Sequence, residues 1–214
     1  MKLATFLTSG LAAFTAAQTP APYTDPKSGI TFSILQHSSG YFFGLALPTN
    51  ATGSTDFIAT IGGKGTGWSG VSLGGAMLGK LLIVAWPNGQ SVLGSFRKTA
   101  THASPAIATG PFTQSPIANG TYVNSTHWTY TFLCSKCIQP DKTTFLPTDT
   151  SPSLGYALNA AAPPQKTNPA SSVAKHTSQG QVVFDLSKAR SGRFEEWAGY
   201  AGVPVAKVGR GFEG

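Results

Sequence analysis

The sequence predicts an all-β protein of the immunoglobulin-like β-sandwich class, with one short helix near its C-terminal end. Hydrophobic residues make up 41% of the 214 residues, enough for a sizeable core, whereas charged residues make up only 11%. Apolar and β-branched runs recur between turns rich in Gly, Pro, Asn and Ser, as in a sandwich of short strands. Only one segment, near the C-terminus, has helical periodicity.

The apolar runs define the expected strands one by one. Strands are predicted at 29–36, 41–48, 55–63, 127–134 and 181–186, with a hairpin at 80–98 that turns at Pro87-Asn88-Gly89. Residues 154–180 are rich in Ala, Pro and Ser and predict a long loop with at most one helical turn. In 186–202 the spacing of Phe194, Trp197 and Ala198 predicts a helix, which Gly199 and Gly202 would end.

The N-terminus has the pattern of a secretory signal. Lys2 precedes a short apolar stretch, residues 3–17, that ends in small residues and is too short to span a membrane. We expect cleavage after Ala17, a domain over 18–203, and a tail or the start of a linker at 204–214. The sequons at Asn50, Asn119 and Asn124 fit export, so a secreted, extracellular protein without membrane attachment is predicted.

The formal net charge of +7 does not indicate a nucleic-acid partner. The 15 basic residues are scattered along the chain and form no run. Such a surface mildly favours acidic partners. Nucleic-acid binding is therefore not expected.

Cys134 and Cys137 are the chain's two cysteines. They follow an aromatic strand and not a helix start, which argues against a thioredoxin-type dithiol. Ile138 stands where covalent c-type haem attachment needs a histidine, and zinc would need more ligands. A short-loop structural disulfide is the favoured interpretation.

Hydrolysis has little support in the sequence. The letters Gly-x-Ser-x-Gly occur at 70–74 within "GTGWSGVSLGG", but no helix pattern follows them as a nucleophile elbow requires, and the eight acidic residues include no pair marked out as a glycosidase acid and base. Side-chain catalysis alone is therefore not predicted.

Two loop residues offer a different chemistry. Met77 lies in the glycine-rich turn "SLGGAMLG", where few bulky neighbours surround it, and His176 lies in the long loop. A glycine-rich turn lets a flat macrocycle approach the backbone, and a Met/His pair is a known axial ligation of haem iron. Taken singly, a packing role for Met77 and a surface role for His176 stay open.

These segments resemble the haem-b cytochrome domain of fungal cellobiose dehydrogenases, an iron-reductase family related to DOMON-type sandwiches. The matching stretches are "YTDPKSGITFSI", "GWSGVSLGGAMLGKLLIVAWPNG", "CSKC" and "HTSQGQVVFDLSKARSGRFEEWAG". The resemblance spans roughly residues 23 to 199. It implies Met77 and His176 as axial ligands of a non-covalent haem b, held at one edge of the sandwich with exposed propionates. Arg97, Arg190 and Arg193 are candidate propionate partners, because guanidinium pairs well with carboxylate.

The resemblance implies outer-sphere, single-electron transfer by an iron-reductase-like domain; whether it counts as an enzyme stays open. The donor would be a flavin dehydrogenase or small reductant, and the acceptor a ferric ion, a quinone or a copper polysaccharide monooxygenase. The letters Gly-x-Gly-x-x-Gly occur at 65–70 and 209–214, but neither stretch lies between a predicted strand and a predicted helix as a dinucleotide fingerprint does, so we expect sugar oxidation to occur elsewhere. The alternative is a haem-free, DOMON-like sandwich that binds carbohydrate on exposed Trp68, Trp86 or Trp128. If His176 is not the ligand, His37, His102 and His127 are next in line.

Overall fold

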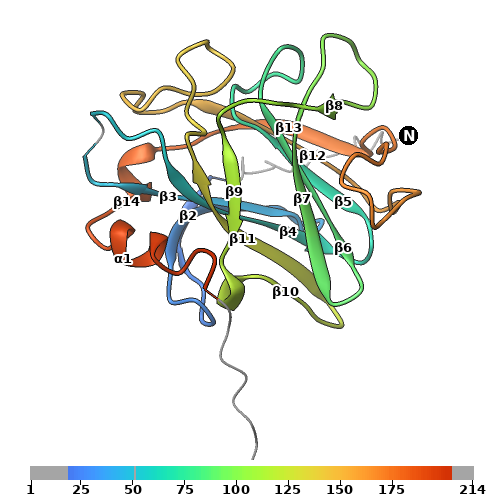
Figure 1. Ribbon diagram of the computed structural model, residues 1–214, viewed down its shortest axis with the longest axis horizontal. Coiled ribbons are helices and arrows are strands. Elements are labelled where there is room, and N and C mark those ends of the chain that lie inside the picture. Colours follow the sequence, from blue (N-terminus) through green and yellow to red (C-terminus); the bar gives the residue numbers. More distant parts are fainter. Residues whose placement is uncertain (1–18, 51, 204–214) are drawn as a thin grey trace, which may run out of the picture.

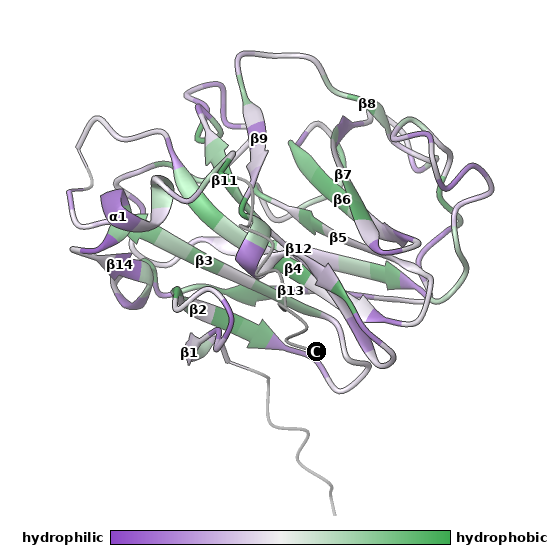
Figure 2. Ribbon diagram, turned by 60° about the horizontal axis from the view of Figure 1, so that its bottom comes forward, coloured by the Kyte–Doolittle hydropathy of each residue, from purple (hydrophilic) through white to green (hydrophobic). Residues whose placement is uncertain are grey.

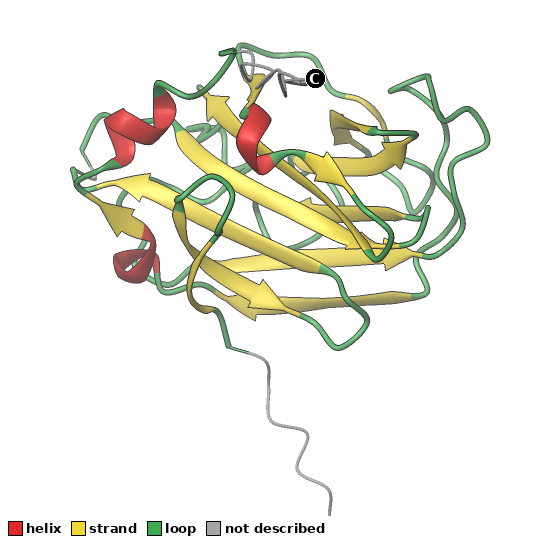
Figure 3. Cartoon of the chain, turned by 90° about the horizontal axis from the view of Figure 1, so that it is seen from below, coloured by secondary structure: helices red, strands yellow, loops and turns green. Residues whose placement is uncertain are grey.

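The structure, a computed structural model, describes residues 19–50 and 52–203. Two β-sheets pack face to face, and short helical segments lie at their margins (Figures 1 and 3). The predicted all-β sandwich is confirmed. Within the described ranges, no helix is long and apolar enough to cross a membrane. The expected signal segment 1–17 and tail 204–214 lie outside the described residues.

The first sheet has eight strands, ordered β1-β2-β3-β4-β11-β10, with β9 beside β11 and β14 beside β3. They are β1 (Ala21–Thr24), β2 (Thr31–Gln36), β3 (Phe42–Pro48), β4 (Phe57–Lys64), β9 (Thr113–Pro116), β10 (Tyr122–Val123), β11 (His127–Ser135) and β14 (Arg190–Ser191). Only the β14–β3 pair is parallel.

The second sheet has six strands, ordered β13-β12-β5-β6-β7-β8. They are β5 (Trp68–Ser72), β6 (Leu82–Asn88), β7 (Ser91–Lys98), β8 (Ala106–Ile107), β12 (Ser153–Asn159) and β13 (Ser178–Val183). Because β12 is antiparallel to both β5 and β13, those two strands run in the same direction. The start of β13 therefore lies at the opposite end of the sheet from the end of β5.

The main core fills the space between the sheets. Phe43 and Ile61 of the first sheet meet Val71 and Ile83 of the second, all at most 3% exposed. In Figure 2 the strands are mostly hydrophobic, whereas the loops are more hydrophilic. A smaller cluster lies on the outer face of the first sheet, where the helix α1 (Phe194–Ala198) packs Trp197 onto that sheet.

Most predicted strands are present. The runs 29–36, 41–48, 55–63 and 127–134 correspond to β2, β3, β4 and β11, and 80–98 forms the β6–β7 hairpin. The hairpin turn is Gly89-Gln90, slightly later than predicted, and Gly89 supplies the positive φ of 61°. The run 181–186 is shifted, because β13 begins at Ser178.

Two predictions need correction. Residues 154–180 are not one loop: β12 occupies their start, β13 their end, and they contain no helical turn. In β12, Leu154, Tyr156 and Leu158 contact the core, while the alternate positions are small, so the strand has a loop-like composition. The predicted helix 186–202 shortens to α1, preceded by the 3₁₀ turn η2 (Leu186–Ala189) and β14. Gly199 does follow its last residue.

The predicted disulfide is confirmed. Cys134, near the end of β11, joins Cys137 with a Cα–Cα distance of 5.6 Å. The backbone N–H groups of Cys137 and Ile138 both donate to the carbonyl of Thr55, which ties this loop to the segment before β4. The two cysteines are only three residues apart in the sequence. The disulfide therefore restricts the unfolded chain little, and its entropic contribution to the stability of the fold is small.

Candidate functional site

The outer face of the six-stranded sheet carries unusually small side chains. In β5, Ser69 points inward and donates to the carbonyl of Gly62, and Val71 joins the core, so Gly70 and Ser72 face outward. Gly70 pairs with Ala157 and Val84, and Ser72 pairs with Gly155 and Leu82. Two successive cross-strand rows therefore leave room above the sheet.

A cavity of about 340 Å³ occupies this room. Apolar side chains of Leu82, Val84, Pro105 and Val173 line its walls. Its floor is the surface of the sheet at the small residues Gly70, Ser72, Gly155 and Ala157. Its volume lies at the lower end of the usual range for small-molecule pockets, and its lining is largely apolar, as such pockets require. Met77 and His176 both line it, so the structure brings the two predicted ligand residues to one site.

The Met77 loop begins where β5 ends. The N–H of Leu73 donates to the carbonyl of Leu81 (3.0 Å), which closes the loop at its base, and Gly79 N–H donates to the carbonyl of Thr99 (2.8 Å). Gly75 and Gly79 have φ of 84° and 68°, a region that glycine adopts without strain. An added Cβ on Gly75 would also lie 2.9 Å from the Ser153 carbonyl. These glycines hold Met77 half-buried at the cavity.

His176 is held by the residues on either side of it. The side-chain amide of Asn159 donates to the carbonyl of Lys175 (2.6 Å), and Thr177 N–H donates to the carbonyl of Leu158 (2.9 Å). Both partners, the donor Asn159 and the acceptor Leu158, lie at the end of β12. The imidazole itself makes no hydrogen bond to any residue the structure describes, so its ring nitrogens are free for a ligand.

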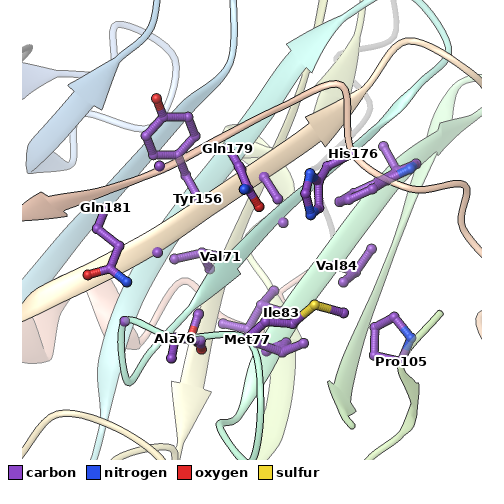
Figure 4. A pocket seen from close by; sticks show the side chains of 18 of the residues that line it. Val71, Ala76, Met77, Ile83, Val84, Pro105, Tyr156, His176, Gln179 and Gln181 are labelled. Atoms are coloured by element: carbon purple, nitrogen blue, oxygen red, sulfur yellow. The ribbon is translucent and has the colours of Figure 1, made fainter. Parts of the chain in front are cut away.

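The two side chains reach the cavity from opposite ends of the sheet. Ser178, two residues after His176, is level with Leu158 and Ser69, whereas the Met77 loop follows Ser72. Three strand residues separate these levels, about 10 Å at 3.3 Å per residue. Figure 4 shows the thioether and the imidazole on two sides of the space above β5.

This donor set suits a centre with two axial ligands better than a bare metal ion. A soft thioether and an imidazole face one apolar space, and both ligand types bind haem iron. No group of three or more His, Cys, Asp or Glu residues that could hold a metal ion occurs in the described ranges. Conventional zinc, calcium or magnesium sites need such a cluster.

The floor is supported from behind by a tyrosine of the first sheet. The buried hydroxyl of Tyr41 donates to the carbonyl of Gly70 (3.2 Å), and burial raises the pKa of this phenol well above its ordinary value. Tyr41 therefore stays neutral over the physiological pH range. Its bond fixes β5 at the residue that leaves the most room above the sheet.

None of the three arginines predicted as propionate partners lines the cavity. Arg190 donates to the carbonyls of Pro48 and Pro147. Arg193 is exposed and donates through two nitrogens to Glu196, which lowers the pKa of that carboxyl to about 2. Both lie on the side of the molecule where α1 and β14 pack.

Arg97 has a structural task beside the cavity. It is 1% exposed, and its guanidinium donates to the carbonyls of Pro105 (3.0 Å), Pro169 (2.6 Å) and Ser171 (2.8 Å), and to the Ser95 hydroxyl. Burial lowers its pKa. Pro105 lines the cavity, and Pro169 and Ser171 belong to the segment that leads to His176. Arg97 thus joins two loops that wall the site.

Replacing Arg97 with methionine should therefore lower the free energy of unfolding by about 2–4 kcal/mol, because three buried carbonyls lose a charged donor. The matched control, Arg193→Met, removes an exposed ion pair and should change the free energy of unfolding little. Urea unfolding of both variants measures the difference. Equal stability of the two variants would contradict this role for Arg97.

The aromatic residues named for carbohydrate binding are not exposed. Trp68, Trp86 and Trp128 are 5%, 0% and 1% exposed. Trp128 lies in the main core, and Trp86 is covered by the loop whose Lys166 carbonyl accepts from its Nε1 (2.9 Å). The prediction that Trp68, Trp86 or Trp128 is an exposed sugar-binding residue is wrong, because Trp128 is packed between the sheets and the other two are buried on the outer face of the second sheet.

The alternative histidines lie elsewhere. His37 and His127 line a separate, more polar groove on the first sheet, and His102 is in an exposed loop.

The sequon residues Asn50, Asn119 and Asn124 are all exposed, as glycosylation requires.

The cavity also contains residues that the sequence did not single out. They are outward-facing residues of β5, β6 and β12 and two glutamines of β13: Gly70, Val84, Gly155, Ala157, Gln179 and Gln181. Except for Val84, their only sequence signal is a small or polar residue at every second position of an apolar strand.

Fold and site together define a β-sandwich domain with a largely apolar cavity between a methionine and a histidine. Comparison with known proteins identifies the family. The family model described as the cytochrome domain of cellobiose dehydrogenase matches residues 23–196. The chain belongs to this family, whose members are electron-transfer domains with a haem cofactor.

Individual relatives agree with this assignment. A pyrroloquinoline quinone-dependent pyranose dehydrogenase of Coprinopsis cinerea is 30% identical over 189 residues, which cover 85% of this chain. The chain spans about a quarter (26%) of the length of that protein. The cytochrome b domain of pyranose dehydrogenase from Coprinopsis cinerea superimposes with a TM-score of 0.78 at 25% identity, covering 86% of this chain and 96% of that one. For the cytochrome domain of Myriococcum thermophilum cellobiose dehydrogenase the TM-score is 0.77 at 28% identity, covering 89% and 100%.

Proposed function

We propose that this chain is a secreted b-type cytochrome that holds one non-covalent haem b between Met77 and His176 and transfers single electrons. The observation that carries the proposal is the placement of these two side chains in one apolar cavity above a floor of small residues. The glycine and alanine positions of β5 and β12 leave the sheet surface free for a flat group.

Non-covalent attachment is supported by the state of the cysteines. The chain has two cysteines, and both belong to the disulfide, so neither thiol is available to bond to a haem vinyl group. Retention then depends on the apolar walls and on the two axial side chains. The haem b would hold an iron centre that cycles between ferric and ferrous states.

The residues of the chain determine how such a centre behaves. The thioether of Met77 would be a soft ligand that favours the ferrous state and so raises the reduction potential, while the His176 imidazole would provide the stronger bond. If both side chains bind the iron, substrate would have no site on it. Electron transfer through the exposed edge is the activity that remains.

The donor and acceptors follow from the family and the relatives. The named relatives are cellobiose and pyranose dehydrogenases, so the proposed donor is a sugar-oxidising dehydrogenase, such as a flavin dehydrogenase, or a small reductant. We propose ferric ion, a quinone or a copper polysaccharide monooxygenase as acceptor. The N-terminal signal pattern and exposed sequons support an extracellular location.

Carbon monoxide provides a direct test of this function. Ferrous haem with both axial positions occupied should bind carbon monoxide slowly or not at all, yet should reduce a ferric complex within the mixing time of an anaerobic stopped-flow experiment. The visible spectrum of the holoprotein reports both reactions. Immediate carbon monoxide binding would contradict the ligand assignment, and failure to reduce ferric complexes or quinones would contradict the function.

A further inference from the structure

The two sides of the cavity differ in polarity. Cross-strand pairing sets the outward-facing residues beneath the cavity in two rows, which run from the edge strand β13 through β12 and β5 to β6. The first row is Gln179, Ala157, Gly70 and Val84, and the second is Gln181, Gly155, Ser72 and Leu82. Each row therefore has a side-chain amide at the β13 end, an aliphatic side chain at the β6 end, and small residues between them.

Both glutamines have unpaired N–H donors. The side-chain amide of Gln179 makes no hydrogen bond to any residue of 19–50 or 52–203, and Gln181 uses only its Oε1, which accepts from the Ser153 hydroxyl (3.2 Å). Both side chains are exposed and line the cavity. Figure 4 shows them on the β13 side of the space, with Val84 and Pro105 across from them. A group bound in the cavity therefore meets free amide donors on one side only.

The opposite side is closed and apolar. Val84, Leu82 and Val173 are 3%, 7% and 8% exposed, and Pro105 completes this wall. None of the Arg, Lys, Asp or Glu residues within the described ranges lines the cavity. A carboxylate placed against this wall would lose its water without gaining a partner, which is unfavourable, whereas an apolar group is favoured there.

Haem b is divided in the same way. Its two propionates lie on neighbouring pyrroles at one edge of the ring, and its vinyl groups lie on the other two pyrroles. Axial ligands bind on opposite faces of the ring, and Met77 and His176 reach the cavity from opposite ends of the sheet. A ring between them would turn one lateral edge to β13 and the other to β6.

We propose that Gln179 and Gln181 set the orientation of the haem. Their amides donate to the propionates along β13, and the vinyl edge packs against Val84 and Leu82. The inference rests on the proposed function, because it requires haem in this cavity. It assigns propionate recognition to two neutral amides, in place of the arginines that the sequence suggested, and places the propionate edge at an open edge of the six-stranded sheet.

The first test is the double variant Gln179→Glu with Gln181→Glu. It keeps the shape of both side chains but replaces the N–H donors with negative charge. Because both side chains are exposed, the haem-free protein should change little in stability. The holoprotein should release haem to excess apomyoglobin roughly 10-fold faster, since the propionates lose two hydrogen bonds and face like charges.

The matched control is Gln36→Glu with Gln90→Glu. It changes the net charge by the same amount at two exposed positions that do not line the cavity. Its haem loss should match that of the wild type. Equal acceleration in the two double variants would show a general effect of charge and would overturn the assignment.

Haem dimethyl ester separates propionate recognition from packing. Its esters carry no charge, so the Gln179→Glu, Gln181→Glu variant should release it at nearly the wild-type rate. An equal acceleration for haem and for its dimethyl ester would mean that the glutamines act through packing and not through the propionates.

Val84→Thr tests the other end of the first row. It adds a hydroxyl to the apolar wall with little change in size, and the vinyl edge is the same in haem and in its dimethyl ester. Both should therefore be released faster by the same factor. A variant that released haem more slowly, but not the ester, would place the propionates at β6 and would overturn the orientation.

The reduction potential gives a measure that does not depend on haem loss. An ionised propionate stabilises the ferric state, so the potential falls as the pH rises through the propionate pKa. Gln179→Leu with Gln181→Leu removes the donors that favour the ionised form and adds no titrating group. The propionate pKa should rise, so this fall in potential should move to higher pH.

Unchanged haem loss in the Glu variant, or an unchanged pH profile in the Leu variant, would also overturn the assignment. A wild-type protein that takes up no haem at all would overturn the proposed function itself. The two failures are therefore distinct.

Discussion

Replacing His176 with alanine should leave the purified protein largely without haem. The imidazole is the stronger of the two proposed axial ligands. Once the imidazole is removed, no covalent bond to a cysteine would retain the haem, because both cysteines are in the disulfide. The loop itself should stay in place, because Asn159 and Leu158 hold the backbone of the two flanking residues, not the imidazole. Haem quantification per mole of folded protein measures the effect.

A suitable control for His176→Ala is His127→Ala. His127 lies in the separate groove on the first sheet, so the variant should keep full haem occupancy. Added imidazole should partly restore the low-spin spectrum of His176→Ala, because it can enter the space left by the side chain. A His176→Ala variant that keeps full, low-spin haem would show that another residue is the ligand.

Replacing Met77 with histidine should keep haem bound but lower its reduction potential by something on the order of 100 mV or more. The new ligand is a harder nitrogen, which favours the ferric state relative to a thioether. Gly75 and Gly79 give the turn backbone freedom to adjust to the shorter, flat imidazole. Potentiometric titration monitored in the visible region measures the shift.

The neighbouring residue offers the control for Met77→His. Leu78 is 38% exposed and does not line the cavity, so Leu78→His adds an imidazole nearby without changing the ligand. Its potential should stay close to that of the wild type. An unchanged reduction potential in Met77→His would mean that Met77 does not bind the iron and is a packing residue.

The two proposed ligands, Met77 and His176, could be predicted from the sequence for physical reasons. Apart from Met1, Met77 is the chain's only methionine, and its glycine neighbours leave it nothing bulky to pack against. His176 is one of four histidines and lies in a long Pro- and Ala-rich stretch. Rare side chains in unusual backbone contexts can be recognised locally, and the structure places both at one cavity.

The floor of the cavity could not be found in the same way. Gly70, Gly155 and Ala157 lie at outward positions of two strands, and the small residues that open the cavity also give these strands the composition of loops. A strand that carries small residues on one face loses the alternating contrast on which strand prediction depends. The small residues that leave room for a cofactor are thus the reason why β5 and β12 could not be recognised as strands from the sequence.

The arginine predictions failed because partner choice is set by tertiary structure. Arg97 bonds to carbonyls 8, 72 and 74 residues away in the sequence, and no local pattern indicates those contacts. Charge complementarity suggested a propionate, but the folded loops offer Arg97 buried carbonyls. The same loops cover Trp86, which the sequence suggested as an exposed aromatic residue.

The visible spectrum of the purified protein, reduced minus oxidised, tests the central claim most directly. If Met77 and His176 hold one haem b, the spectrum should show the sharp bands of low-spin, six-coordinate haem, with one haem per chain and full reversibility on reoxidation. A folded protein that shows no haem bands, even after incubation with free haem, would contradict the account. A high-spin spectrum would contradict it equally, since it would mean that the two side chains do not both bind the iron.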